Sequence, residues 1–157
     1  LQKLIVGLVI VSAVILAVTS FWNDSLVIDE VPHVGAGYSY LKKGDYRLNP
    51  EHPPLAKDIA ALPLVFRSFN DSVFESPVWL ENKNDQWNFG RTFIYNSGND
   101  ADFITRSVKS AVLIIFIVSA LIIYAWTKNL YGFGAGLIAL FLFTFSSIFL
   151  MARDRYL

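Results

Sequence analysis

Three apolar runs constrain this chain more than any other feature of its sequence. Residues 4–21 contain no charged side chain, and a run of about 18 residues reaches the lower end of what a helix needs to cross about 30 Å of hydrocarbon. Two further apolar runs cover residues 108–126 and 133–150 approximately. We therefore predict a mainly α polytopic membrane protein with three transmembrane helices and a large outer loop that carries short helices.

The predicted boundaries place transmembrane helices at residues 4–21, 107–127 and 132–151. A tight joint at residues 127–132 makes the second and third helices a hairpin. For the first run the alternative is a cleaved signal peptide, because Lys3 precedes an apolar core. No small-x-small cleavage site follows, however, and Phe21 and Trp22 are typical of an interfacial anchor, which favours a retained span.

Positive charges in the short flanking segments predict the orientation. Lys3 and Lys128 lie on the cytoplasmic side under the positive-inside rule, so the loop at residues 22–106 faces outward, at the cell membrane. The chain begins at Leu1 rather than methionine, and the given sequence stops at Leu157, shortly after the third apolar run. We expect a fragment of a longer protein, with residues 152–157 the start of a truncated outer loop.

The composition supports the membrane class and excludes others. Hydrophobic residues make up 54% of the chain and charged residues 17%, and the mean hydropathy is +0.45, which is too apolar for an ordinary soluble domain. Lys and Arg balance Asp and Glu at 13 each, so no basic excess favours nucleic acid as a partner. The absence of cysteine excludes a disulfide framework and a thiol nucleophile.

Two short helices are predicted in the outer loop. One covers residues 29–43, with Pro32 in its first turn and Gly44 in the left-handed position beyond its end. The second begins after Pro53-Pro54 and covers residues 55–66. It carries Leu55, Ile59 and Leu62 on one face and Lys57 and Asp58 on the other, a pattern typical of a helix lying on a membrane surface. Residues 67–102 are predicted to form an ordered but irregular loop.

The acidic pair Asp29-Glu30, at the predicted start of the first short helix, is the leading catalytic candidate. Charge close to a bilayer is costly unless it is paired or used. Helical spacing puts His33 on the same face as both carboxylates, which suggests an acid–base cluster. The alternative is an ordinary helix cap stabilised by the helix dipole.

Together with His33, four further residues are candidates for binding substrate or phosphate. His52 and Lys57 flank a rigid Pro-Pro turn, where the lysine could hold a lipid-linked phosphate or merely snorkel from an interfacial helix. Arg153 and Arg155 end the third run and could bind phosphate bidentately or anchor a helix end. Asp29, Glu30, His33 and His52 could in principle bind a divalent cation such as Mg²⁺ or Mn²⁺, but their spacing predicts no firm metal site and hence no firm cofactor.

The order and spacing of these motifs resemble the N-terminal part of a GT-C membrane glycosyltransferase of glycosyltransferase family 39, the protein O-mannosyltransferase and aminoarabinose-transferase type. The resemblance covers nearly the whole chain from Leu4. It is carried by the acidic pair Asp29-Glu30, the histidine and aromatic helix His33, Tyr38 and Tyr40, the turn Lys43-Gly44-Asp45-Tyr46, and the motif His52-Pro53-Pro54-Leu55-Ala56-Lys57.

The resemblance implies an inverting transfer of a sugar from a polyprenyl-phosphate carrier to an acceptor hydroxyl of a protein, lipid or glycan. It implies that Asp29 is the catalytic base or positions the acceptor, and that Glu30 supports it. The fragment alone is expected to be inactive. The competing hypotheses are a non-enzymatic membrane-anchored binding domain that uses the aromatic loop around Trp79 and Tyr95, and a lipid-phosphate hydrolase, which lacks a visible nucleophile.

Overall fold

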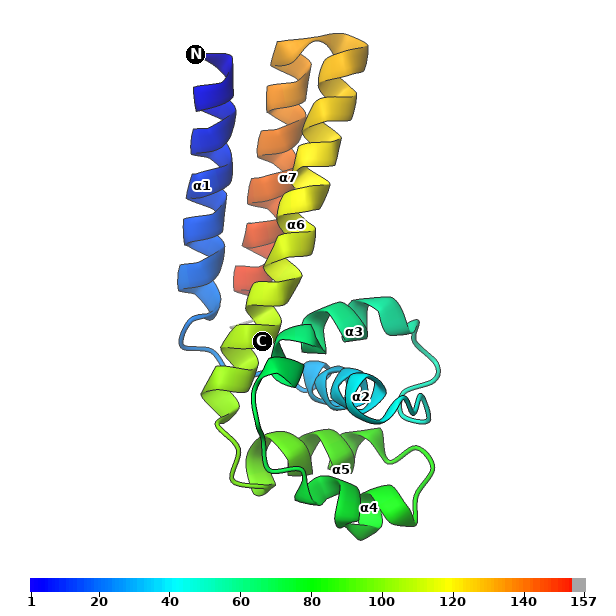
Figure 1. Ribbon diagram of the computed structural model, residues 1–157. Helices are drawn as coiled ribbons and strands as arrows, with labels where there is room; N and C mark the ends of the chain where they lie inside the picture. Colours follow the sequence, from blue (N-terminus) through cyan, green and yellow to red (C-terminus); the bar gives the residue numbers. More distant parts are fainter. Residues whose placement is uncertain (154–157) are drawn as a thin grey trace. The chain divides into compact units, whose positions relative to one another are not determined.

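The part of the chain that the structure describes is mainly helical. The computed structural model describes residues 1–153, and the side chains of residues 1–146. The helices, in chain order, are α1 (Gln2–Phe21), α2 (Glu30–Lys43), α3 (Pro54–Ala61), η1 (Leu62–Phe66), η2 (Ser72–Glu75), α4 (Pro77–Leu80), α5 (Gln86–Arg91), η3 (Thr92–Asn96), α6 (Ala101–Tyr131) and α7 (Phe133–Arg153) (Figure 1). The predicted mainly α class is confirmed.

Inter-residue contacts divide the chain into two compact units. The first consists of Leu1–Asn23 and Leu113–Leu157, and the second of Asp24–Val112. In the first unit, α1 packs against α7, and Val6, Ala120 and Leu140 are buried together. The second unit contains α2 to α5 and the first part of α6, and it holds every candidate site residue except those at the end of α7.

Two of the described helices, α1 and α6, are long and apolar enough to cross a membrane. The third predicted span lies in α7, whose described apolar part, Phe133–Ser146, is shorter than a span. Length and composition therefore support two spanning helices in the described residues.

The joint between α6 and α7 is shorter than the sequence predicted. Residues 127–131, expected to form part of a turn, continue α6 as helix, and only Gly132 separates it from α7. Gly132 has a φ of 85°, which is open to glycine but strained for other residues. Lys128 in the last turn of α6 favours the longer helix, because a positive charge interacts well with the C-terminal end of the helix dipole.

Helix α2 is the centre of the second unit. Its residues from Val34 to Tyr40 are all buried, and α3 and α5 pack on it from two sides (Figure 1). Gly44 ends the helix in the left-handed conformation, with φ 65°, and its N–H donates to the carbonyl of Tyr40. The predicted helix at residues 29–43 and its glycine cap are thus confirmed to within one residue.

The predicted irregular loop at residues 67–102 is wrong in its main feature. This segment forms four short helices, and its aromatic side chains build the core of the second unit. The Phe93 ring stacks on Tyr38 of α2 at 4.2 Å, and Trp79 packs edge-on against Phe74 at 5.0 Å. Irregular spacing hid these helices, because none is long enough to show a helical period.

Candidate functional site

Glu30 is held by its surroundings at the start of α2. Its carboxylate accepts a hydrogen bond from the N–H of Val27 at 2.9 Å, while its own N–H donates to the Val27 carbonyl at 2.9 Å. The Lys109 ammonium lies 3.7 Å from the same carboxylate and donates to the carbonyl of Ser25. Glu30 therefore ties the segment before α2 to the first part of α6.

Asp29 differs sharply from its neighbour. Its side chain is exposed and makes no hydrogen bond or ion pair within the part of the chain that the structure describes. The backbone of Asp29 is already helical, with φ −73° and ψ −20°, and the side chain does not cap α2. Asp29 therefore occupies the N-cap position of α2 without making a side-chain capping hydrogen bond, and its carboxylate is open to a ligand.

His33 and His52 meet beside the first turn of α2. Their ring centroids are 5.0 Å apart in an edge-on arrangement, although His33 lies in α2 and His52 in the loop before α3. Burial lowers the pKa of His33, and the charges of His52 and Lys57 lower it further, against the opposing effects of Asn49 and Asp29. A neutral imidazole near Asp29 can accept or donate a proton near neutral pH.

Lys57 does not project toward solvent as either sequence interpretation required. It is only 4% exposed. The three N–H groups of its ammonium are shared among four oxygens: the Tyr40 hydroxyl at 2.9 Å, the Asn49 carbonyl at 2.7 Å, the Asn49 side-chain oxygen at 3.0 Å and the His52 carbonyl at 2.9 Å. Burial lowers the pKa of Lys57, against the nearby carboxylates of Glu51 and Asp58. This geometry leaves no donor for an external phosphate and makes Lys57 the link that fixes the His52 loop.

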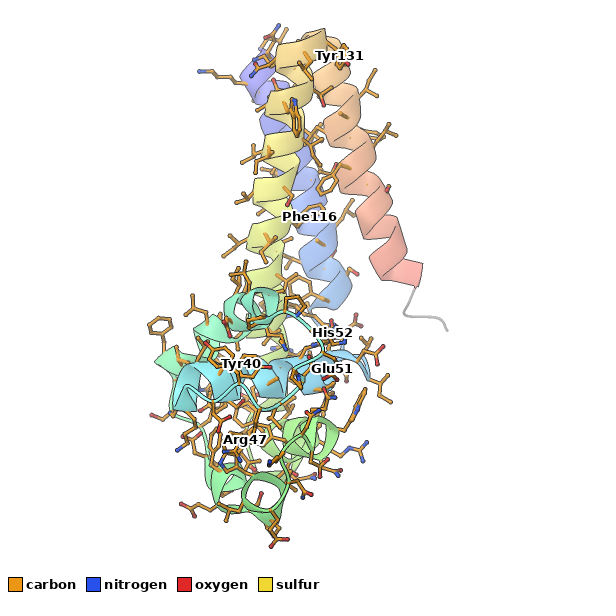
Figure 2. All side chains as sticks on the ribbon, turned by 90° about the vertical axis from the view of Figure 1, so that its right-hand side faces the viewer. Tyr40, Arg47, Glu51, His52, Phe116 and Tyr131 are labelled. Carbon is orange, nitrogen blue, oxygen red and sulfur yellow. The ribbon has the colours of Figure 1, made fainter. Side chains whose placement is uncertain are left out.

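The loop that carries His52 is held by a polar network that the sequence did not reveal. Asn49 adopts a left-handed backbone, with φ 50°, and its N–H donates to the side chain of Asn84 at 2.8 Å. Gln86 of α5 donates to Glu51 at 2.6 Å and accepts from the Asn49 amide. Figure 2 labels Glu51 and His52, which are neighbours in this loop. The available signal was the Asn-Pro dipeptide at residues 49 and 50, because asparagine tolerates this backbone better than most residues.

Glycines let α3 and α5 approach α2 closely enough to form the site. A Cβ at Gly35 would lie 2.8 Å from the Cα of Gly90 in α5, and one at Gly37 would overlap the Lys57 carbonyl in α3. Such overlaps exclude any larger residue without movement of a helix. The close packing brings His33 of α2 next to the loop that carries His52.

The remaining candidates fall outside this cluster. Arg155 lies outside the described residues, and Arg153 ends α7 with a side chain that is also outside them. No group of three or more acidic or histidine side chains in the described residues is placed to hold a metal ion. The four-residue cation site considered from the sequence is not assembled there, since Glu30 faces Val27 and Lys109 instead.

Comparison of the chain with protein-family models, with curated proteins and with solved structures finds no match in any of the three. The chemistry of the site therefore rests on its own geometry.

Proposed function

We propose that this chain is the N-terminal part of an inverting membrane glycosyltransferase of the GT-C type, which moves a sugar from a polyprenyl-phosphate carrier to an acceptor hydroxyl. The observation that carries the proposal is the contrast between the acidic neighbours: the exposed Asp29 carboxylate has no bonding partner in the described residues, whereas Glu30 is held by Val27 and Lys109. An exposed carboxylate that no other group in the described residues engages is free to bind and deprotonate an acceptor hydroxyl.

In the proposed reaction, Asp29 accepts the proton of the acceptor hydroxyl as that oxygen attacks the anomeric carbon. The bond from this carbon to the carrier phosphate breaks, and the phosphate leaves with the bonding electron pair. His33, whose pKa is lowered and which lies one helical turn from Asp29, orients the acceptor by hydrogen bonding. Glu30 acts indirectly, because it fixes the backbone from which Asp29 projects.

The phosphate-binding role is reassigned in this proposal. Lys57 is occupied by four internal oxygens, so it positions the His52 loop. His52 is exposed next to His33 and remains a candidate donor to the leaving phosphate. Arg153 and Arg155 remain candidates for neutralising its charge, as guanidinium groups bind phosphate well.

The proposed setting is the cell membrane, with α1, α6 and α7 all spanning it and the unit at Asp24–Val112 outside. The 21 helical residues of α7 correspond to a length of about 31 Å, enough to cross the hydrocarbon core. The chain then forms part of a longer enzyme with further spans. A divalent cation stays a candidate activator only, with no residues assigned to it.

The test uses the full-length protein that contains this chain, purified in detergent and supplied with a labelled polyprenyl-phosphate sugar. Transfer of label to a hydroxyl acceptor by the wild-type protein, and its loss in Asp29→Asn, supports the proposal. Wild-type protein that transfers no label from any of a panel of such carriers, or unchanged transfer by Asp29→Asn, overturns it.

A further inference from the structure

Helix α3 and the following η1 carry two opposite faces that differ in their contacts. Lys57, Ala60, Ala61 and Leu64 are buried against the rest of the unit. The other face is exposed: Leu55 is 69%, Leu62 47% and Phe66 82% accessible, and Ile59 is partly buried between them.

The exposed face contains no polar side chain. Between residues 53 and 66, every exposed residue is apolar, namely Pro53, Pro54, Leu55, Ala56, Leu62 and Phe66. The two charged residues of α3 do not relieve this, because Lys57 turns inward and Asp58 is partly buried. A surface helix in contact with water normally carries its polar residues on that side, so this arrangement is inverted. Contiguous apolar surface of this kind indicates a contact with something apolar.

The position of this unit in the chain indicates what that apolar environment is. The unit begins at Asp24, directly after α1 ends at Phe21, and it ends at Val112 inside α6. Both α1 and α6 are long and apolar enough to cross a membrane. A unit tethered at both ends by spanning helices stays at the bilayer surface, where an amphipathic helix buries its apolar face at the boundary of headgroups and acyl chains.

We propose that the exposed face of α3 and η1, formed by Leu55, Leu62 and Phe66, inserts into the outer boundary of the lipid bilayer. This inference rests on the proposed membrane placement of α1 and α6. Insertion brings the start of α3, where the His52 loop ends, close to the lipid headgroups. The carrier's phosphate lies at that same depth in the proposed function.

The chain contains no cysteine, so single cysteines can be labelled without background. Leu62→Cys and Phe66→Cys report on the proposed face, and both positions are exposed enough to accept a label without disturbing the fold. Leu80→Cys on α4 is the matched control, because Leu80 is also apolar and 66% exposed. Val11→Cys on α1, 55% exposed, reports separately on whether the spans enter the bilayer.

Each variant of the full chain is labelled with bimane and reconstituted in phosphatidylcholine nanodiscs. We expect nitroxide lipids labelled near the headgroup to quench positions 62 and 66 severalfold more than position 80, and aqueous iodide to do the reverse. One outcome is that deep nitroxide lipids quench position 11 while neither the headgroup nor the deep nitroxide lipids quench positions 62 and 66. That result would overturn the insertion of the α3 and η1 face but leave the membrane placement of α1 intact. If the nitroxide lipids do not quench position 11, α1 does not lie in the bilayer, and the proposed membrane placement is contradicted together with the insertion. Protection of positions 62 and 66 from both iodide and nitroxide lipids means a protein contact, which also overturns the proposal.

Discussion

The ammonium of Lys57 donates a hydrogen bond to the backbone carbonyl of His52 at 2.9 Å, inside the second unit of the chain. The same nitrogen reaches Tyr40 and Asn49, so one buried cation joins α2, α3 and the loop between them. This arrangement makes Lys57 a structural residue whose loss should release His52 from its position beside His33.

Lys57→Met is therefore expected to destabilise the protein. It removes an ammonium whose oxygen partners are left buried without donors, at a cost of about 1–3 kcal/mol for unsatisfied groups of this kind. The midpoint of thermal unfolding in detergent measures the change. Lys83→Met, at an exposed position, is the control and should leave the midpoint unchanged. Equal midpoints for the two variants would contradict the structural role.

Asp58→Asn is expected to stabilise the protein near neutral pH. Burial raises the pKa of Asp58, and one of its carboxyl oxygens is buried without a hydrogen-bond partner in the described residues. A raised carboxyl pKa favours folding below the unfolded pKa, and this contribution is lost as pH rises through the folded pKa. The variant should gain more in unfolding midpoint at pH 7 than at pH 4. The exposed Glu81→Gln is the control, and a gain that is independent of pH would argue against the assigned cause.

His33 is expected to make stability depend on pH below neutrality. Its pKa is lowered mainly by burial, so the unfolded chain binds the proton more readily. The corresponding stability is complete above the unfolded pKa of about 6.5 and is lost as pH falls through the folded pKa. Unfolding midpoints between pH 7.5 and 5.5, a range chosen about that value, should fall in the wild type and change less in His33→Gln. Parallel profiles would refute this origin.

Close packing of α2 on α5 is expected to make Gly35 sensitive to a single methyl group. Gly35→Ala would place its Cβ 2.8 Å from the Cα of Gly90, and overpacking of this kind costs about 1–3 kcal/mol. Gly7→Ala in α1 meets nothing within 4 Å and should be neutral or slightly stabilising, because alanine favours helix over glycine. Thermal unfolding of the two variants compares them directly. An unchanged unfolding midpoint for Gly35→Ala would mean that α2 and α5 can move apart without loss of stability.

Local signals predicted those parts of the structure that depend on neighbouring residues. The helix at Glu30–Lys43 and its Gly44 cap followed from Pro32, a helical apolar spacing and the glycine itself. The separation of Lys57 from Leu55 and Leu62 on α3 was also predicted, but the burial of Lys57 inside its own unit was not.

The rest could not be predicted because it depends on contacts between distant segments. Tyr40, Asn49 and His52 surround Lys57 only once the chain has reversed direction after α2. The difference between Asp29 and Glu30 likewise depends on Lys109, which lies in α6. Two adjacent carboxylates look equivalent in a sequence, and only the fold shows which of them is already bonded.

The central claim is that Asp29 performs chemistry while Glu30 holds the backbone in place. The most direct measurement compares Asp29→Asn with Glu30→Gln in the full-length protein, by sugar transfer from a polyprenyl-phosphate donor and by thermal unfolding. We expect Asp29→Asn to lose transfer by about 10²–10⁴-fold, the usual contribution of a general base, at an unchanged unfolding midpoint. Glu30→Gln should lower the midpoint, because it weakens the charged contact with Lys109. Full sugar transfer by Asp29→Asn would contradict the account. So would a loss of transfer that is accompanied by a matching fall in the unfolding midpoint of the same variant.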